Sequence, residues 1–465
     1  MNAPAIWILL PLGLSGLIWL PRRGRTVAGL GSVIALLLAG FAWLIPIDAA
    51  LRLGPLSLKI APSMQVLGRR FLLSGADQPI LTLIYALTAL WFFGSEAAGI
   101  ARRMVPLGLA ITALMIGSLA VEPFLYAALL IEMAVLLAVP LLSPLQQVPG
   151  RGIVRFLIYQ TLAVPFILFS GWLLAGVEAS PADLLLTAQA GALLGLGFAF
   201  LLAIFPLYTW IPMLMEESSP YAVGFILWIL PAATLLFGSG FIDRYAWLRL
   251  SPQLILTLRS AGLLMVVTGG IWAAFQNHLG RMMGYAAIVE TGFTLLALSL
   301  GSQNGVMIFF MFFIPRALGL AVWSLALSTL RSNIESLHFS AVQGIARTYP
   351  VVSTGLIIAH FSAVGFPLLA GFPVLLVLWQ DMARVSLGIA FWFFLGIFGL
   401  FIGGVRALAV LVISPENSTW GLGETWQQGI LMGLGLIVLF LLGLFPQLVQ
   451  PLIVNLPAAF EHLGH

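Results

Sequence analysis

The chain contains no cysteine, a single lysine and few charges of either sign. Without cysteine it can form no disulfide and no thiolate-ligated zinc or iron–sulfur centre. Charged residues make up only 8% of its 465 residues, whereas 61% are hydrophobic and the mean hydropathy is +1.10. Such a composition lies far outside the range of soluble domains. The sequence therefore predicts an integral membrane protein that has the lipid bilayer as its surroundings.

Signatures of soluble enzymes are also missing. The sequence has no phosphate-binding P-loop, no dinucleotide fingerprint between a strand and a helix, no HExxH and no GxSxG with partners. Its five histidines, two of them at the extreme C-terminus, show no metal-ligand or haem-ligand spacing. The excess of positive charge comes from arginines in loops and says little about nucleic acid. We therefore expect no cofactor, no metal and no nucleic-acid partner for this chain, and no covalent catalysis by it.

Apolar runs long enough to cross a hydrocarbon core of about 30 Å recur from end to end. They predict an all-α polytopic fold of about 14 transmembrane helices, forming one membrane domain over residues 1–465. The predicted spans are Ala5–Leu20, Val27–Ile45, Ile80–Phe93, Met104–Ala120, Phe124–Leu142, Ile153–Ala175, Leu184–Leu207, Val223–Phe241, Leu254–Phe275, Met283–Leu300, Val306–Leu330, Val351–Leu378, Ser386–Val412 and Ile430–Leu452.

The distribution of arginine predicts the orientation in the membrane. The first apolar run is followed by arginines rather than by a small-residue cleavage site, so we expect a retained first span. Basic residues favour the cytoplasmic side of a membrane. Alternate loops carry Arg22, Arg23, Arg25, Arg102, Arg103 and Arg151. We therefore expect these loops in the cytoplasm and both termini on the outer side of the plasma (inner) membrane.

Two segments outside the spans have patterns of their own. The stretch Pro46–Asp77 is the longest connection, and its part Leu51–Ile60 alternates apolar and polar residues. This period of two is typical of strands, which predicts a short strand or hairpin on the outer face. The segment Arg331–Tyr349 is the most polar run between spans and is compatible with a short surface helix or a solvated loop.

Two predicted spans contain pairs of prolines. Pro206 and Pro212 lie within Gly197–Pro212, and Pro367 and Pro373 lie within GFPLLAGFP. Proline removes a helical hydrogen bond and clashes with the preceding turn. Inside a membrane such a break persists only where protein or a wet cavity satisfies the freed backbone groups. Broken helices of this kind mark ion and substrate pathways in transporters, so the two pairs predict a repeated unit that forms a channel.

Ionisable residues inside spans are costly and usually face a bundle interior or a wet cavity. Glu132 stands alone among apolar residues, and we interpret it as a proton-binding carboxylate; a carboxyl retained for packing is the alternative. Glu290 and His360 are further candidates for a proton path, each with a packing role as the alternative. Arg316 could neutralise a carboxylate or cap carbonyls freed beside Pro315.

Other polar residues receive less prominent roles. Tyr208 could relay a proton, but aromatic packing is the favoured interpretation. Arg155 and Arg406 are expected near the headgroups, with their charged ends extended toward water. Glu216 and Glu217 follow a predicted span, and we expect both to be solvated.

Several motifs together resemble one family. FPLYTWIP followed by ESSPYAVGFILW resembles the FPFHTWLPDAHxxAPT signature of the antiporter-like, proton-translocating membrane subunits of complex I (NADH:quinone oxidoreductase). The same family includes subunits of multisubunit Na⁺/H⁺ antiporters and membrane-bound hydrogenases. GRMMGYAAIVETG, FFIPRALGLAVW, GIARTYPVVST and GFPLLAGFP are similar to further family segments in the same order. The resemblance covers nearly the whole chain.

The resemblance implies 14 helices, with spans four to eight and nine to thirteen forming two inverted five-helix repeats. Each repeat would contain one proline-broken helix, namely span seven and span twelve. The chain would then divide into N-terminal helices with an external hairpin, a first repeat, a second repeat and a C-terminal helix. The boundaries would be 1–103, 104–241, 252–413 and 414–465.

The resemblance also implies a proton path, from which this sequence departs. Glu132 falls on the family's glutamate of span five. The family's lysine of span seven falls on Leu201, its lysine of span eight on Pro231 or a neighbour, and its lysine or glutamate of span twelve on an apolar residue near Leu375. The lysine after FF becomes Arg316, which cannot replace a titrating lysine by the same chemistry because arginine stays protonated. Tyr208 and Glu290 occupy positions at which the family has histidines.

Three hypotheses for the function of the chain therefore follow from the sequence. The first is a proton-translocating subunit of the membrane arm of a complex I-like assembly, with pumping impaired by the missing lysines. The second is a degenerate structural subunit that keeps the fold without moving ions. The third is an ion-translocating partner in a cation-antiport or carbon-uptake complex. All three imply other membrane subunits as partners, and the first and third imply protons or Na⁺. An unrelated secondary carrier would require the order of the motifs to be a coincidence.

Overall fold

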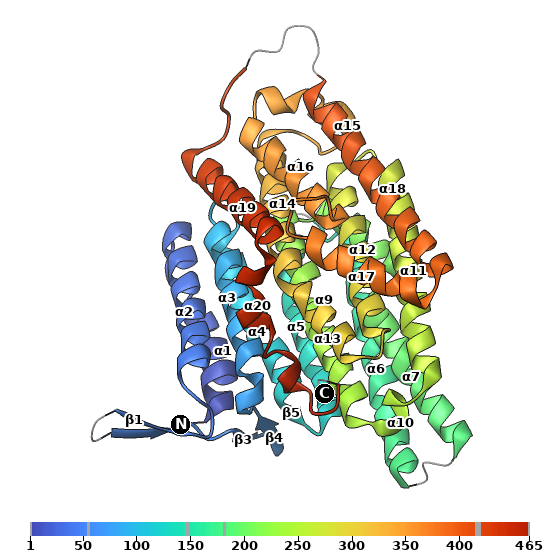
Figure 1. Cartoon of the computed structure of the whole chain (residues 1–465). Coiled ribbons are helices and arrows are strands. Elements are labelled where there is room, and N and C mark those ends of the chain that lie inside the picture. The colour runs from blue at the N-terminus through green and yellow to red at the C-terminus, as the bar shows by residue number, and fades with distance from the viewer. Residues whose placement is uncertain (1, 54–55, 145–147, 180–182, 414–419, 464–465) are drawn as a thin grey trace.

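The computed structural model describes residues 2–53, 56–144, 148–179, 183–413 and 420–463. Within them the chain forms a bundle of long helices that run roughly alongside one another (Figure 1). The two ends of the chain lie at the same end of the bundle as the strands, which agrees with the predicted common side for the termini and the hairpin. The all-α membrane fold is therefore confirmed.

The bounds of the helices follow the predicted spans closely. The N-terminal group is a π-helical stretch Ala5–Leu9 continuing into α1 (Leu10–Leu17), α2 (Gly24–Leu44) and α3 (Gln78–Gly94). The next group is α4 (Ala101–Ala120), α5 (Ala127–Leu142), α6 (Arg151–Ala179), α7 (Leu184–Leu201), α8 (Trp210–Glu217) and α9 (Pro220–Arg244), followed by the short α10 (Ala246–Arg249).

The second half has the same succession of elements. It comprises α11 (Pro252–Phe275), α12 (Leu279–Leu298), α13 (Gln303–Met311), α14 (Phe313–Asn333), α15 (Phe339–Val342), α16 (Pro350–Val364), α17 (Phe372–Val385) and α18 (Leu387–Val412). The chain then forms α19 (Trp426–Leu444) and α20 (Gln450–Ile453).

Ten helical segments in the described residues are long and apolar enough to cross a membrane. Three shorter apolar helices accompany them: Ala5–Leu17, Leu185–Leu201 and Pro350–Val364. Two of these three precede the proline breaks, where a span is divided into two pieces. The chain is thus a multi-pass membrane protein, and the number of 14 spans stays a prediction.

The helices separate into a buried centre and an outer layer. In α4 and α9, 89% and 78% of the spanning window is buried, whereas in α19 the share is 17%. Trp91 of α3 packs against Tyr221, Phe225 and Trp228 of α9, with ring centroids 4.9 to 6.3 Å apart. The outer helices expose large apolar side chains, as lipid-facing helices do. Central charged groups are therefore screened from lipid by a full layer of helices.

The two halves repeat one packing pattern. In the first, α4 packs on α5 and α9, and α6 packs on α7. In the second, α11 packs on α12 and α18, and α14 packs on α16. Because successive spans alternate in direction, elements five spans apart run in opposite directions. The pattern is thus compatible with the inverted relation implied by the resemblance.

Both breaks begin with the same C-terminal cap. At the end of α7, Ile204 N–H donates to Ala199 O (2.9 Å) and Ala203 N–H donates to Phe200 O (3.3 Å). At the end of α16, Phe366 N–H donates to Phe361 O (2.9 Å) and Gly365 N–H donates to Ser362 O (3.0 Å). This is the pattern of a Schellman motif, and Ala203 and Gly365 have the positive φ that it requires (53° and 75°).

The two prolines of each pair have different positions. Pro206 and Pro367 lie in the breaks themselves. Pro212 and Pro373 lie in the first turns of α8 and α17, where a backbone N–H has no helical partner to lose. The prediction that these spans are broken is confirmed. Each break is produced by one proline and a Schellman cap, and the second proline marks where the helix resumes.

The predicted strand region forms two small sheets. Ala50–Leu53 (β1) and Leu56–Lys59 (β2) pair as an antiparallel hairpin, as the alternation of this segment predicts. Ser63–Val66 (β3), Arg69–Leu72 (β4) and Val121–Glu122 (β5) form the second sheet. The polar segment 331–349 contains the short helix α15, in agreement with the first of its two predicted alternatives, and a 3₁₀ turn, Ile345–Arg347.

Candidate functional site

Arg316 and Glu290 form a buried pair of charges in the centre of the bundle. Arg316 lies in the first turn of α14 and Glu290 in the middle of α12. Arg316 Nε is 3.9 Å from Glu290 Oε2, and the two side chains are 6% and 10% exposed. Opposite charges this deep compensate each other, whereas either alone would be strongly unfavourable. The expectation that Arg316 faces a carboxylate or caps carbonyls is met in both respects, because the guanidinium also has carbonyl partners.

A proline in α9 supplies one of these partners. Arg316 Nη2 donates to Leu227 O (3.0 Å) and to Thr291 Oγ1 (2.8 Å). In a regular helix Leu227 O would accept from the N–H four residues later, but that residue is Pro231, which has none. Pro231 thus frees the carbonyl to which the arginine donates. Residues 231 and 316 form one local arrangement.

A small cavity connects this pair to the first broken helix. It offers about 10 Å³ to the centre of a water molecule, at the lower limit for holding one water. Its lining includes Gln160, Leu201, Ala203, Pro231, Thr291 and Arg316. The wall is apolar at Leu201 and Pro231, two positions at which the resemblance implies lysines in the family.

A second cavity of the same size lies on the other side of the pair. Glu290 and Arg316 line it together with Ser362, Gly371 and Leu375 from the second broken helix and its surroundings. Leu375, the third replaced lysine position, is 5% exposed and packs against Gly365. Arg316 thus borders two cavities, each next to one broken helix, and Glu290 borders the second of them.

Glu132 lies away from this centre, on α5. Its Oε1 accepts a hydrogen bond from Thr161 Oγ1 (2.7 Å), and its side chain is half-buried at a lateral surface of the bundle. The neighbouring Gln160 donates to Leu201 O (3.2 Å), a carbonyl freed at the end of α7. Two adjacent residues of α6 therefore link Glu132 to the wall of the first cavity. Glu132 is not among the residues lining either cavity.

His360 and Tyr208 are packed among aromatic side chains. His360 is fully buried, its Nε2 is 2.9 Å from Leu400 O, and its ring lies 4.6 Å from that of Trp323. Tyr208 lies between Phe205 and Tyr285. Neither residue lines the two central cavities. Their placement agrees with the packing alternatives, and their part in a proton path stays a prediction.

The arginines expected near the headgroups both lie close to helix ends. Arg406 donates to Gln276 O (3.3 Å) and Asn277 Oδ1 (2.6 Å), just beyond the C-terminus of α11. A cation at this end of a helix interacts favourably with its last carbonyls. Arg155 is exposed near the start of α6, and its Nη1 lies 3.3 Å from Met213 Sδ.

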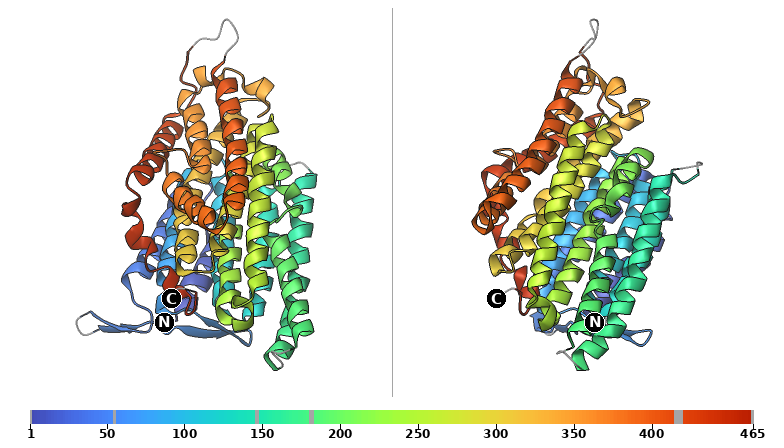
Figure 2. Two further views of the ribbon diagram at one scale, coloured as in Figure 1. Left: turned by 45° about the vertical axis from the view of Figure 1, so that its right-hand side comes forward. Right: turned by 90° about the vertical axis from the view of Figure 1, so that its right-hand side faces the viewer.

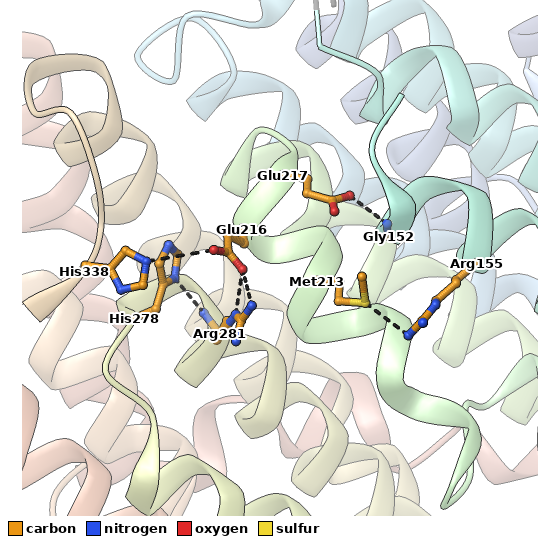
Figure 3. Close-up of polar contacts among 8 residues, drawn as sticks. All are labelled: Gly152, Arg155, Met213, Glu216, Glu217, His278, Arg281 and His338. Carbon is orange, nitrogen blue, oxygen red and sulfur yellow. Dashed lines mark hydrogen bonds and ion pairs between the residues drawn. The ribbon is translucent and has the colours of Figure 1, made fainter. Parts of the chain in front are cut away.

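The carboxylates at the end of α8 are bonded, which corrects the expectation of full solvation. Glu216 accepts from Arg281 Nε (2.7 Å), and Glu217 accepts from Gly152 N–H at the start of α6 (2.7 Å) (Figure 3). Both side chains are partly buried. The end of the first broken helix is therefore fixed to α6 and to α12.

Two histidines lie beside Glu216, although the sequence shows no metal-ligand spacing. His338 Nε2 is 3.9 Å from Glu216 Oε1, and the His338 and His278 rings are edge to face with centroids 4.8 Å apart. One ligand atom from each of Glu216, His278 and His338 falls within 4.8 Å of the others. Burial lowers the pKa of His278 to about 4, and the Glu216 carboxylate opposes this shift. The sequence spacing of the histidines did not indicate this proximity, which the packing of the chain produces.

Sequence reasoning also overlooked two residues of the central site. Gln160 is a polar residue inside a predicted span, and this rarity could have identified it. Thr291 gave no such signal, because threonine is common in membrane helices and usually bonds its own backbone. It does donate to Ala287 O (2.9 Å), and its oxygen also accepts from Arg316.

Comparison with known proteins identifies a family for about half of the chain. Residues 173–403 match the family described as "NADH:quinone oxidoreductase/Mrp antiporter, TM", so this stretch carries the membrane region of that family. One relative is the "NADH-quinone oxidoreductase subunit 14" of Thermus thermophilus. It is 27% identical over 445 residues, which cover 90% of this chain and 96% of the relative.

Solved structures show the same antiporter-family fold over the full length. A chain of respiratory complex I from Thermus thermophilus superposes with a TM-score of 0.77 at 20% identity, covering 99% of this chain and 100% of the other. A chain of an archaeal membrane-bound sulfane sulfur reductase gives a TM-score of 0.80 at 17% identity, covering 100% and 98%. These likenesses establish the fold of the chain.

Proposed function

We propose that this chain is an antiporter-like, proton-translocating subunit in the membrane arm of a complex I-like respiratory or energy-converting assembly. The observation that carries the proposal is the buried Arg316–Glu290 pair, in which Arg316 lines two small cavities that each border a broken helix and Glu290 lines the second of them. The family match and the names of its relatives support the same assignment. Other membrane subunits are the partners, and the electrons and cofactors of such an assembly reside in them.

In this proposal Glu290 is the group that takes up and releases the proton. Arginine stays charged in proteins, so Arg316 serves as a fixed positive charge and not as a relay. Its hydrogen bonds to Leu227 O and Thr291 Oγ1 keep the guanidinium in place. Each cavity beside Arg316 has room for about one water, and protons would reach Glu290 through the second cavity, which it lines. Apolar residues at 201, 231 and 375 reduce the rate of this step, because no lysine there can pass the proton on.

The second candidate function is that of a structural subunit without ion transport. The apolar wall of both cavities at the replaced lysine positions favours it, as does the packing of His360 and Tyr208 away from the cavities. A subunit in a cation-antiport complex is a third candidate, favoured by the family's inclusion of Mrp antiporter chains. Residence in the plasma membrane, with both termini outside, is part of our proposal.

Proton uptake by vesicles that contain the intact purified complex tests the proposal. We expect Glu290→Gln to abolish most of the uptake assigned to this subunit, and Glu132→Gln to reduce it. Glu335→Gln is the matched control, because Glu335 is exposed in the connection after α14. Each complex is first shown to be fully assembled. Unchanged proton stoichiometry in both assembled variants would reject the transport proposal and support the structural one.

A further inference from the structure

Three side chains with metal-binding atoms meet at the end of the bundle where α8 ends. Glu216 belongs to the last turn of α8, His278 is the N-cap of α12, and His338 is the N-cap of α15. These residues are separated by about sixty positions in the sequence, yet one ligand atom from each lies within 4.8 Å of the others. Figure 3 shows the three side chains pointing toward one another. Nothing in the proposed proton path uses this cluster.

Backbone hydrogen bonds hold the two histidines opposite each other. Leu279 N–H donates to Leu337 O (3.0 Å), and Phe339 N–H donates to Asn277 O (2.9 Å), forming an antiparallel bridge between residues 278 and 338. His278 Nδ1 accepts from Arg281 N–H (3.2 Å) as the cap of α12. The cap fixes the orientation of the ring and leaves Nε2 as its ligand atom. The site is therefore built on main-chain contacts and not on mobile side chains alone.

The carboxylate is oriented as well. Arg281 Nε donates to Glu216 Oε2 (2.7 Å), and the same guanidinium forms an ion pair with that oxygen. This leaves Glu216 Oε1 directed at His338 Nε2, 3.9 Å away. In metal sites, the side chains that bind the metal are regularly oriented by hydrogen bonds from neighbouring groups. The positive charge of Arg281 also reduces the attraction for a cation, so the site should be weaker than a closed structural zinc site.

We propose that Glu216, His278 and His338 form a binding site for a divalent transition-metal ion of the zinc class. Two imidazoles, one carboxylate and water are a common ligand set for Zn²⁺. Tetrahedral coordination requires ligand atoms roughly 3.3 Å apart, from bonds of about 2.0–2.1 Å. Rotation of His338 and Glu216, whose side chains are 51% and 34% exposed, closes the remaining gap. The same exposure provides an entry route and room for water ligands.

A bound metal would connect the two halves of the molecule. Glu216 ends the broken helix of the first half, whereas both histidines belong to the second half. Occupation of the site would therefore restrict movement of α8 relative to α12 and α15. The site is independent of the proposed proton path, so binding can be tested without a transport assay.

Zinc binding to the full-length chain, purified in detergent through a tag without histidines, tests the site. Isothermal titration calorimetry with Zn²⁺ is expected to show one site in the wild type that is weakened at least about tenfold in Glu216→Gln and His338→Ala. Visible spectra with Co²⁺ should show d–d bands of a low-coordinate site that disappear in the same variants. His462→Ala is the matched control, because His462 is exposed near Asp243 at the opposite end of the bundle, and it should bind as the wild type does.

Equal zinc affinity and stoichiometry in the wild type and in both ligand variants would overturn the proposal. Size-exclusion profiles show that each variant is folded before titration. If a variant aggregates, X-ray absorption at the zinc edge of the loaded wild type decides instead. Two imidazoles in the first coordination sphere support the site, and a sphere of oxygen ligands alone refutes it.

Discussion

Arg316 connects three helices through one guanidinium group. It extends from α14, bonds Leu227 O of α9 and Thr291 of α12, and lies opposite Glu290. A lysine has three donors on a flexible chain, whereas arginine offers a planar fork that is always charged. At the position where the resemblance implies a lysine, the arginine is thus a fixed charge and not a group that can titrate. Stability and proton transfer at this position should respond differently to mutation.

Removing the guanidinium should destabilise the protein strongly. In Arg316→Met, Glu290 loses its counter-charge and Leu227 O loses its donor, and breaking a buried ion pair typically costs about 3–5 kcal/mol. We expect a clear fall in the temperature at which the detergent-purified chain loses its monodisperse peak. Arg155→Met, which removes an exposed arginine, should stay within about 0.5 kcal/mol of the wild type. Equal stability of the two variants would show that the central pair does not hold the bundle together.

Restoring a lysine at 231 should couple to residue 316. Pro231 and Arg316 line the same small cavity, so Pro231→Lys adds a second cation beside a fixed one. We expect this single change to destabilise the chain, and the penalty to shrink when Arg316→Met is present. A double-mutant cycle of thermal stabilities should give a coupling of about 0.5–3 kcal/mol. Additive effects would mean that the two positions act independently.

At the scale of elements, the broken helices depend on close backbone contacts. Gln160 donates a hydrogen bond to Leu201 O at the end of α7. At the second break, Ser362 Oγ accepts a hydrogen bond from Gly371 N–H (3.3 Å). These contacts satisfy the groups that the breaks expose, as a membrane interior requires. A Cβ at Gly371 would lie 2.0 Å from Ser362 O, so only glycine fits there.

Gly371→Ala should therefore disturb the second break. The added methyl group meets backbone that cannot rotate away, and overpacking of this kind usually costs about 1–3 kcal/mol. Gly433→Ala is a matched control in α19, where a Cβ would meet nothing within 4 Å. There the higher helix propensity of alanine should stabilise the chain by about 0.5–1 kcal/mol. Thermal unfolding of the two variants should thus shift in opposite directions, and a shared direction would contradict the packing argument.

At the scale of the whole molecule, the ends of the bundle differ in character. One end carries both termini and the two small sheets, and the other carries the connection before α19 (Figure 1). Figure 2 shows the same separation from two further directions. The arginine bias predicts that the first end faces outward. The complete absence of cysteine makes this orientation simple to test.

Single cysteines placed at the two ends should react from opposite sides of the membrane. Leu67 is 98% exposed between β3 and β4, and Leu422 is 80% exposed before α19. In right-side-out vesicles, a membrane-impermeant maleimide should label Leu67→Cys and leave Leu422→Cys unlabelled until the membrane is opened. The label is detected by mass spectrometry of this chain, so that maleimide bound to partner subunits does not contribute to the signal. Labelling in the reverse order would invert the proposed topology.

Particular residues show how much of the fold and of the candidate site could be predicted from the sequence. Pro206 and Pro367 located both breaks, because proline acts through its own local chemistry. Glu290 and Arg316 were each recognised as costly residues in a span, but their pairing was not, since it depends on how α12 and α14 pack. His278 and His338 carried no recognisable spacing. Their meeting with Glu216 depends on a backbone bridge between two loops that are far apart in the sequence.

The sequence by itself determined the membrane environment, the helical class and the positions of both breaks. These properties follow from composition, from apolar run length and from the local chemistry of proline. Only the tertiary structure decided which polar groups share a partner. It placed Arg316 on the carbonyl that Pro231 frees, put two small cavities beside Arg316, and joined Glu216 to two histidines. Such contacts depend on which helix faces meet, and that is decided by packing over the whole bundle.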